Sequence, residues 1–248
     1  MTTIGTAGWS LPAALAADFP ADGTHLSRYA RRFSGVEINS TFYRRHRPST
    51  FASWASQVPD GFRFAVKMPR LITHELALRA ASGALDDFVS DVRNLGGHLG
   101  PVLVQLPPGL VYDGAVTRRF LRALRERFTG AVVCEPRHPS WHSAAATAAL
   151  AEWRIGRVAA HPPRLAAVEE PGGWLGPADD GAGATIYYRL HGHPRIYWSN
   201  YDAAAIAAWA LVMARWPAPA DVWCIFDNTA AGAAAANALA LQQIIRRT

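Results

Sequence analysis

The sequence contains almost no lysine. Lys67 is the single lysine of the 248 residues, and the other members of the count of 25 Lys and Arg are arginine. Arginine serves wherever only positive charge is needed, whereas lysine offers a compact ammonium and a pKa that burial can lower. Lys67 is therefore a candidate for a buried or catalytic amine. The alternative is a surface lysine that survives by chance in an Arg-rich composition.

Cysteine is also scarce. Cys134 and Cys224 are the two cysteines, and each lies inside an apolar run, so we expect small buried hydrophobic residues rather than a disulfide framework. No apolar run is long enough for a membrane span. The first residues lack the basic and then apolar pattern of a signal peptide. We therefore expect a cytoplasmic protein with no membrane partner.

Several catalytic signatures are missing. The first glycine-containing segment is not G-x-G-x-x-G, and the chain has no G-x-S-x-G, no HExxH and no cysteine cluster. Glu37, Glu135, Asp227 and the pair His191 and His193 could supply ligands for a divalent metal. Two nearby histidines are common by chance, however, so no metal and no other cofactor is predicted.

Hydrophobic residues and arginine, in contrast, are abundant. Half of the residues are hydrophobic, which is ample for a sizeable core, and the formal net charge is +6. The charge permits binding of an anionic ligand or of nucleic acid, although an Arg-rich composition would produce it in any case.

Apolar periodicity predicts eight strands that alternate with about seven helices. The predicted strands cover residues 4–9, 36–39, 62–67, 102–106, 131–135, 155–160, 185–191 and 222–227. The predicted helices cover residues 25–33, 49–58, 84–95, 116–128, 144–153, 203–216 and 231–245. Residues 161–184 are rich in Pro, Gly and acidic residues and are predicted as a long loop.

This alternation predicts an α/β fold with parallel strands. We expect residues 1–248 to form a single domain, a TIM-type (β/α)8 barrel in which a long loop replaces the helix between strands 6 and 7. A doubly wound open sheet is the alternative.

Period-two alternation directs a set of polar side chains into this barrel. They lie at or near strand ends, where barrel active sites are built. The set is Glu37, Asn39, Arg63, Lys67, Gln105, Glu135, Tyr187, Arg189, His191 and Asp227. Because buried charges need partners, we expect Glu37, Glu135 and Asp227 to pair with Arg63, Lys67 and Arg189, with Glu37 beside Lys67. The alternative to an active site is a structural salt-bridge network that closes the barrel.

Six motifs carry a resemblance to a known family. They are VEINSTFY (36–43), FAVKMPRLITHE (64–75), VQLPPG (104–109), EPRHPSW (135–141), YYRLHG (187–192) and FDNT (226–229). In order and spacing they resemble the domain of unknown function 72 family, also called YecE-like. The resemblance implies a TIM-type barrel, and the family has no established activity. It adds Tyr43, His74, Arg137, Trp141 and Asn228 to the candidate site residues.

The sequence supports three hypotheses about function. The first is an enzyme for a small polar or anionic, phosphate-like or sugar-like ligand, with isomerase, lyase and hydrolase chemistry all open. Lys67 would be a base, Schiff-base amine or electrostatic clamp, with Glu37 or Glu135 as acid/base partner. The expected substrate-binding residues are Asn39, Tyr43, His74, Gln105, Arg137, Trp141, Arg189, His191, Asp227 and Asn228. The second hypothesis is a nucleic-acid-binding or repair-type barrel, and the third a ligand sensor or scaffold without turnover.

Overall fold

The computed structural model describes residues 2–163, 170–176 and 183–247 of the chain. The strands are β1 (Thr2–Thr6), β2 (Gly35–Ile38), β3 (Arg63–Lys67), β4 (Leu99–Gln105), β5 (Val132–Glu135), β6 (Gly156–Arg157), β7 (Ala159–His161), β8 (Gly172–Gly173), β9 (Thr185–Leu190) and β10 (Asp221–Phe226). The α-helices are α1 (His25–Ala30), α2 (Pro48–Ala55), α3 (Ser82–Val92), α4 (Gly114–Arg127), α5 (Ala144–Glu152), α6 (Ala203–Ala214) and α7 (Ala233–Ile245).

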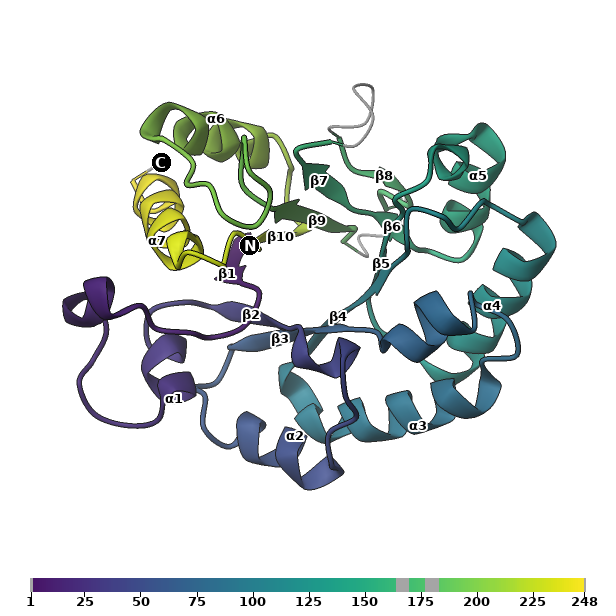
Figure 1. The fold of residues 1–248 in the computed structure, drawn as a ribbon, viewed down its shortest axis with the longest axis horizontal. Coiled ribbons are helices and arrows are strands. Elements are labelled where there is room, and N and C mark those ends of the chain that lie inside the picture. The colour runs from purple at the N-terminus through teal and green to yellow at the C-terminus, as the bar shows by residue number, and fades with distance from the viewer. Residues whose placement is uncertain (1, 164–169, 177–182, 248) are drawn as a thin grey trace.

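The strands form two sheets, with the helices around them (Figure 1). One sheet has the order β1-β10-β9-β7 and the other β2-β3-β4-β5-β6-β8. All neighbours are parallel except β6 and β8. The sheets meet where Ala7 and Glu37 form a parallel bridge and where β6 and β7 follow each other along the chain.

Alternation along the strands separates an outer from an inner apolar layer. Phe64 and Val66 of β3 join the larger core that the helices cover, whereas Ala65 between them belongs to a second, smaller cluster. The other buried members of that inner cluster are Leu103, Val133, Val158, Tyr187, Trp223 and Ile225. The period of two predicted for the strands is therefore present, and the polar side chains of the site lie on the inner face.

Glycine permits the close approach of β1 and β2. A Cβ on Gly5 would lie 2.1 Å from the carbonyl oxygen of Gly35, and one on Gly35 would lie 2.5 Å from Thr3 Cγ2. Any larger residue at these positions would push the two strands apart.

The region after β5 differs from the prediction. The sixth strand expected over 155–160 is divided into β6 and β7, and the predicted loop 161–184 contains β8, which pairs antiparallel with β6. Gly173 adopts a φ of 69°, which lets the chain approach β6 without a clashing side chain. The parts of the predicted loop at 164–169 and 177–182 lie outside the described residues. A short 3-10 helix at Ala13–Asp18 was also not predicted, because it buries no residue and has no apolar stripe.

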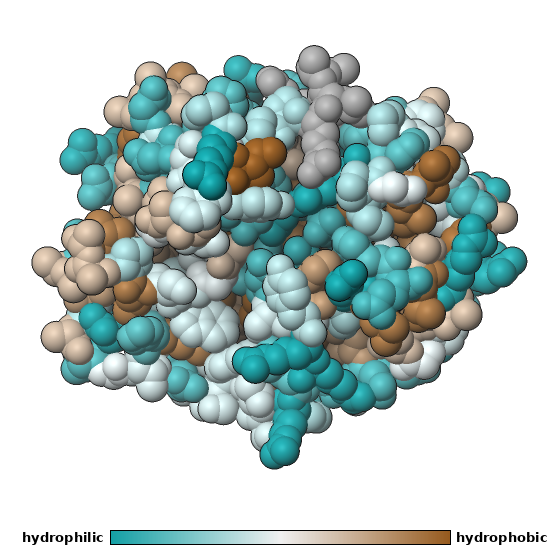
Figure 2. Space-filling model, in the orientation of Figure 1, coloured by the Kyte–Doolittle hydropathy of each residue, from teal (hydrophilic) through white to brown (hydrophobic). Residues whose placement is uncertain are grey.

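Figure 2 shows hydrophobic residues in separate patches between hydrophilic ones on the face that it draws. Among the described residues, the helices are too short or too polar to cross a membrane.

Candidate functional site

Arg189 lies at the centre of the polar cluster and is completely buried. Its Nε and Nη2 donate to the two oxygens of Glu37 at 3.0 and 2.7 Å. Its Nη1 donates to Glu135 Oε2 at 2.6 Å, and Nη2 also donates to Asp227 Oδ2 at 3.1 Å. Four hydrogen bonds thus occupy a guanidinium that has five N–H groups.

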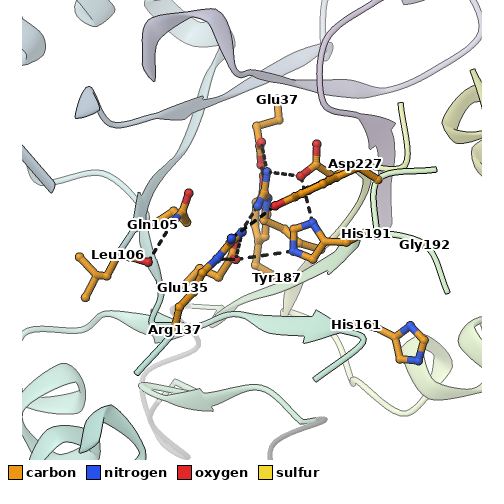
Figure 3. Close-up of polar contacts among 12 residues, drawn as sticks. Glu37, Gln105, Leu106, Glu135, Arg137, His161, Tyr187, His191, Gly192 and Asp227 are labelled. Atoms are coloured by element: carbon orange, nitrogen blue, oxygen red, sulfur yellow. Dashed lines mark hydrogen bonds and ion pairs between the residues drawn. The ribbon is translucent and has the colours of Figure 1, made fainter. Parts of the chain in front are cut away.

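The parallel topology explains why these residues meet. Glu37 belongs to β2, Glu135 is the last residue of β5, Arg189 belongs to β9 and Asp227 directly follows β10. The carboxyl ends of parallel strands converge, so residues far apart in sequence share one buried space (Figure 3). Tyr187 adds its hydroxyl, which donates to Glu37 Oε2 at 2.9 Å.

A second layer of contacts joins Arg137 to this cluster. Its Nε and Nη2 lie 2.9 and 2.8 Å from Glu135 Oε1, and its Nη1 donates to the hydroxyl of Tyr197 at 3.3 Å. Glu135 therefore bridges the two arginines, with one oxygen on each. The side chain of Arg137 keeps 12% of its surface exposed, so it is the arginine of the pair that a ligand can reach.

His191 is oriented by a carboxylate. Its Nδ1 lies 3.0 Å from Asp227 Oδ2, whereas its Nε2 lies 3.5 Å from Glu135 Oε1 and is buried without a hydrogen-bond partner. A small hollow is lined by Glu135, Arg137, His191 and the side chain of Tyr197, among others. The pairing with Asp227 fixes the ring, and Nε2 lies toward Glu135, which lines this hollow together with His191.

The charges set the protonation of the cluster. Burial alone would raise the pKa of Glu135, but Arg189 and Arg137 hold it well below its usual range. Burial would likewise raise the pKa of Asp227, which Arg189 and His191 lower. Burial would lower the pKa of His191, and its contacts with Asp227 and Glu135 raise it instead. Both carboxylates are therefore favoured in their ionised form, and His191 is favoured in its protonated form.

Lys67 lies at the end of β3 and is 6% exposed. The Thr41 hydroxyl donates to the carbonyl oxygen of Lys67, which fixes the short 3-10 turn that carries Phe42. Lys67 Nζ lies 4.1 Å from the centroid of the Phe42 ring, and it forms no hydrogen bond or ion pair with the described residues. Burial and the charge of Arg189 lower the pKa of Lys67 to about 8, against the opposing effect of the three carboxylates.

Two predicted ion pairs are wrong. Glu37 does not pair with Lys67, because its register partner on β3 is Ala65 and its oxygens are taken by Arg189 and Tyr187. Arg63 does not reach the carboxylates of Glu37, Glu135 and Asp227 at the carboxyl ends of the strands, a region that we call the mouth. It lies at the start of β3 and pairs there with Asp221 at 2.8 Å.

Two other predicted residues, Asn39 and Gln105, lie at strand ends, and His74 lies in the helical turn Leu71–Glu75 that follows β3. Asn39 directly follows β2, and its buried Oδ1 has no hydrogen-bond partner. Gln105 ends β4 and donates to the carbonyl oxygen of Leu106 at 2.8 Å. The ring of His74 packs on Phe42 at 4.9 Å, and burial and then the charge of Lys67 lower the pKa of His74.

Three predicted residues are engaged elsewhere. Tyr43 is 76% exposed. Trp141 is buried, and its indole N–H donates to the carbonyl oxygen of Leu110 at 2.8 Å. Asn228 is buried and donates to the carbonyl oxygen of Ser199 and to Asn237 Oδ1, both at 2.9 Å. The contacts of Trp141 and Asn228 brace loops around the mouth.

Sequence reasoning missed Phe42 as a site residue, and it considered Tyr197 only as an aromatic side chain for nucleic-acid binding. Phe42 stands in the motif at 36–43, but its contact with Lys67 depends on the turn after β2, which the alternation of strands does not predict. Tyr197 adopts a φ of 70°, which is rare for a residue with a side chain, and its ring packs edge-on against His191 at 5.4 Å. Tyr187 was predicted to point inward but was not placed among the site residues.

A larger cavity of about 440 Å³ lies beside the mouth. It is lined by the segments that follow β2 and β3, by Phe51 of α2 and by residues of α3, and Tyr43 is the one predicted site residue in its lining. The buried ion pairs of Arg189 lie at the strand ends and not in this cavity. Within the described residues, no group of three or more His, Cys, Asp or Glu could hold a metal ion, because arginines occupy the carboxylate oxygens.

The model of the family described as "Protein of unknown function DUF72" matches residues 3–248. The chain belongs to this family. The family predicted from the six motifs is thereby confirmed.

Two curated relatives of this DUF72 protein are the UPF0759 protein YecE of Escherichia coli strain K12 and that of Escherichia coli O157:H7. Each is 37% identical over 84 residues, which cover 34% of this chain and 31% of the relative. The chain therefore matches about a third of the length of these relatives.

The fold is shared with solved structures. Crystal structures of DUF72 family proteins from Enterococcus faecalis V583 and Thermotoga maritima MSB8 match with a TM-score of 0.79 each, at 20% and 22% identity. Each match covers 99% of this chain, with 96% and 99% of the respective neighbour. At such identities the likeness shows the fold alone.

Proposed function

We propose that this DUF72 protein is an enzyme that binds a small polar, anionic ligand at the carboxyl ends of its strands. Lys67 is its reactive base. The observation that carries the proposal is a buried amine without a hydrogen bond or ion pair among the described residues, at the edge of a cluster whose three carboxylates are paired with Arg189.

The charge of the mouth favours an anion. While Lys67 and His191 are both protonated, four cations (with Arg137 and Arg189) stand against three carboxylates (Glu37, Glu135 and Asp227), so the site is net positive when an anion arrives. It becomes neutral when Lys67 gives up its proton. In a buried site a net positive charge attracts an anion far more strongly than it would in water.

The residues divide into those that bind or react with the ligand and those that hold these residues in position. With a pKa of about 8, the Lys67 amine can accept a proton near neutral pH, as a general base requires. His191 and the partly exposed Arg137 line the hollow and bind the anion. Glu37, Glu135 and Arg189 are committed to each other, so their role is to hold this arrangement rigid.

The test is a thermal-shift screen of small phosphorylated, carboxylated and neutral polar compounds. A ligand at 100 times its Kd stabilises a protein by about 2.7 kcal/mol, which for a chain of this size raises Tm by about 5–10 °C. We expect anionic compounds to give such shifts, and the shifts to shrink in Lys67→Met and Arg137→Met. Arg119→Met, on the exposed face of α4, is the matched control and should bind as the wild type does.

A compound found in this way is then incubated with the protein and followed by NMR. Conversion by the wild type and none by Lys67→Met supports an enzyme. Binding without conversion indicates a ligand sensor or scaffold. Equal conversion by both proteins removes Lys67 from the mechanism.

We further infer that residues 1–248 are one domain in which the two sheets close into a single (β/α)8 barrel. The bridge between Ala7 and Glu37 joins the sheets on one side, and Val158 alone separates β6 from β7 on the other. Arg189 of one sheet binds Glu37 and Glu135 of the other across the interior. The two buried free cysteines fit a reducing, cytoplasmic location.

Exposed aromatic residues support a second candidate function, the binding of single-stranded nucleic acid. Tyr43, Tyr197 and Trp198 are 76%, 38% and 44% exposed, and bases stack on such rings. Fluorescence titration with oligonucleotides at 50 and 200 mM salt tests this function. Affinity should fall steeply with salt, and absence of binding at low salt excludes it.

A further inference from the structure

We propose that Lys67 forms a covalent imine with the carbonyl carbon of a small anionic aldehyde or ketone. This inference rests on the proposed function and narrows it to one substrate class and one kind of chemistry. It depends on how the mouth distributes its charges between one lysine and two arginines.

The arginines take up the carboxylates and leave the amine unbound. Glu37, Glu135 and Asp227 all contact Arg189, and Glu135 also binds Arg137. A lysine that served only to neutralise charge would be expected to sit on one of these carboxylates. Lys67 Nζ instead contacts no carboxylate of the described residues within 4 Å, so its lone pair is available once the proton leaves.

The surroundings of Nζ favour the neutral amine. One side is covered by the face of Phe42, whose centroid is 4.1 Å away, and the side chain is almost wholly removed from water. Arg189 adds a fixed positive charge within electrostatic range, and together with burial it lowers the pKa of Lys67 to about 8. Desolvation beside another cation is a recognised way to make a lysine nucleophilic.

The step balances without a further reactant. The Lys67 nitrogen attacks the carbonyl carbon, and the C=O bond is replaced by C=N. The two hydrogens of the neutral amine leave with the carbonyl oxygen as one molecule of water. Arg137 and His191 line the small hollow beside the cluster, and we assign the carboxylate or phosphate of the same molecule to them, which restricts the class to anionic carbonyl compounds.

The scarcity of lysine makes the experiment unusually clean. Wild-type protein is incubated with glyoxylate and sodium borohydride, which delivers hydride to an imine carbon and turns it into a stable secondary amine. Intact mass and peptide mapping then locate the adduct. Apart from the α-amine of the chain, Lys67 is the single primary amine in the sequence.

We expect one adduct per chain on Lys67, its loss in Lys67→Arg and Lys67→Met, and at least tenfold slower labelling in Arg137→Met. Acetaldehyde, a neutral probe, should label Arg137→Met as fast as wild type. Labelling of the α-amine alone, or labelling of Lys67 only after unfolding in urea, overturns the imine. Suppose that the labelling experiment overturns the imine. If Lys67→Met nevertheless abolishes the thermal shift by an anionic compound, the proposed function stands without the imine. If that shift is also unchanged, both fall.

Discussion

Replacing Arg189 with methionine should destabilise the fold more than any loss of a surface charge would. Arg189 is fully buried and contacts three carboxylates at distances of 2.6 to 3.1 Å. Methionine keeps much of the volume but removes the charge and all four hydrogen bonds. Glu37, Glu135 and Asp227 would then share a buried space without their common cation.

Removing one partner of a buried ion pair costs about 3–5 kcal/mol, since the remaining charge stays buried and unpaired. For a chain of this length the cost corresponds to a fall in Tm of about 6–20 °C. We expect the full effect for Arg189→Met, because Arg137 contacts only Glu135 of the three carboxylates.

The change should also reverse the response to acid. In the wild type the pKa values of Glu135 and Asp227 are lowered, so their contribution to stability is present above a pH of about 4 and is lost as the pH falls through their folded pKa. In Arg189→Met burial dominates and raises both pKa values. The variant should therefore gain stability as the pH falls from 6 to 4.5, where the wild type does not.

Urea unfolding at several pH values measures both effects. Arg63→Met is the matched control, because Arg63 forms a single, partly exposed ion pair with Asp221 and should cost no more than about 1 kcal/mol. Equal losses in the two variants, or an Arg189→Met protein that loses stability on mild acidification, would refute the central role given to Arg189.

Three further predictions concern Tyr187 and His191 in the charge cluster and Gly5 on β1. Tyr187→Phe removes a hydrogen bond to a buried carboxylate of Glu37, so urea unfolding should show a loss of about 1.5–3 kcal/mol, and a loss below 0.5 kcal/mol would contradict the bond. The raised pKa of His191 gives stability that is present below its ordinary value of 6.5 and is lost as the pH rises through the folded pKa, so the wild type should have a lower Tm at pH 8 than at pH 6. His191→Asn should flatten this difference, and an unchanged slope would assign it to another group. Gly5→Ala should cost at least about 1–3 kcal/mol, because its Cβ would lie 2.1 Å from a backbone oxygen, whereas Gly83→Ala on α3 has open space and should be neutral or stabilising.

The fold was accessible to sequence reasoning where a strand keeps a regular period. Phe64 and Val66 on one side and Ala65 on the other lie in the layers that alternation predicts. The same rule directed Glu37, Glu135 and Arg189 to one buried space, because an inward-pointing charge at the end of a parallel strand has few other positions available.

Which side chains form ion pairs within that space could not be predicted from the sequence. Which carboxylate binds Arg189 depends on register and on side-chain reach, and the sequence shows neither. The expected contact of Lys67 with Glu37 failed because the bidentate geometry of arginine matches a carboxylate better than a single ammonium does. The approach of Tyr197 to His191 depends on a left-handed backbone conformation in a loop, for which the local sequence gives no signal.

The central claim is that Lys67 is a buried amine with a lowered pKa, and one NMR titration tests it directly. Protein grown with ¹³C-labelled lysine carries one labelled side chain, since the sequence has one lysine. We predict that its ¹³Cε signal titrates with a midpoint of about 8. A midpoint near the ordinary value of 10.5 would contradict the account and return Lys67 to the role of a simple positive charge.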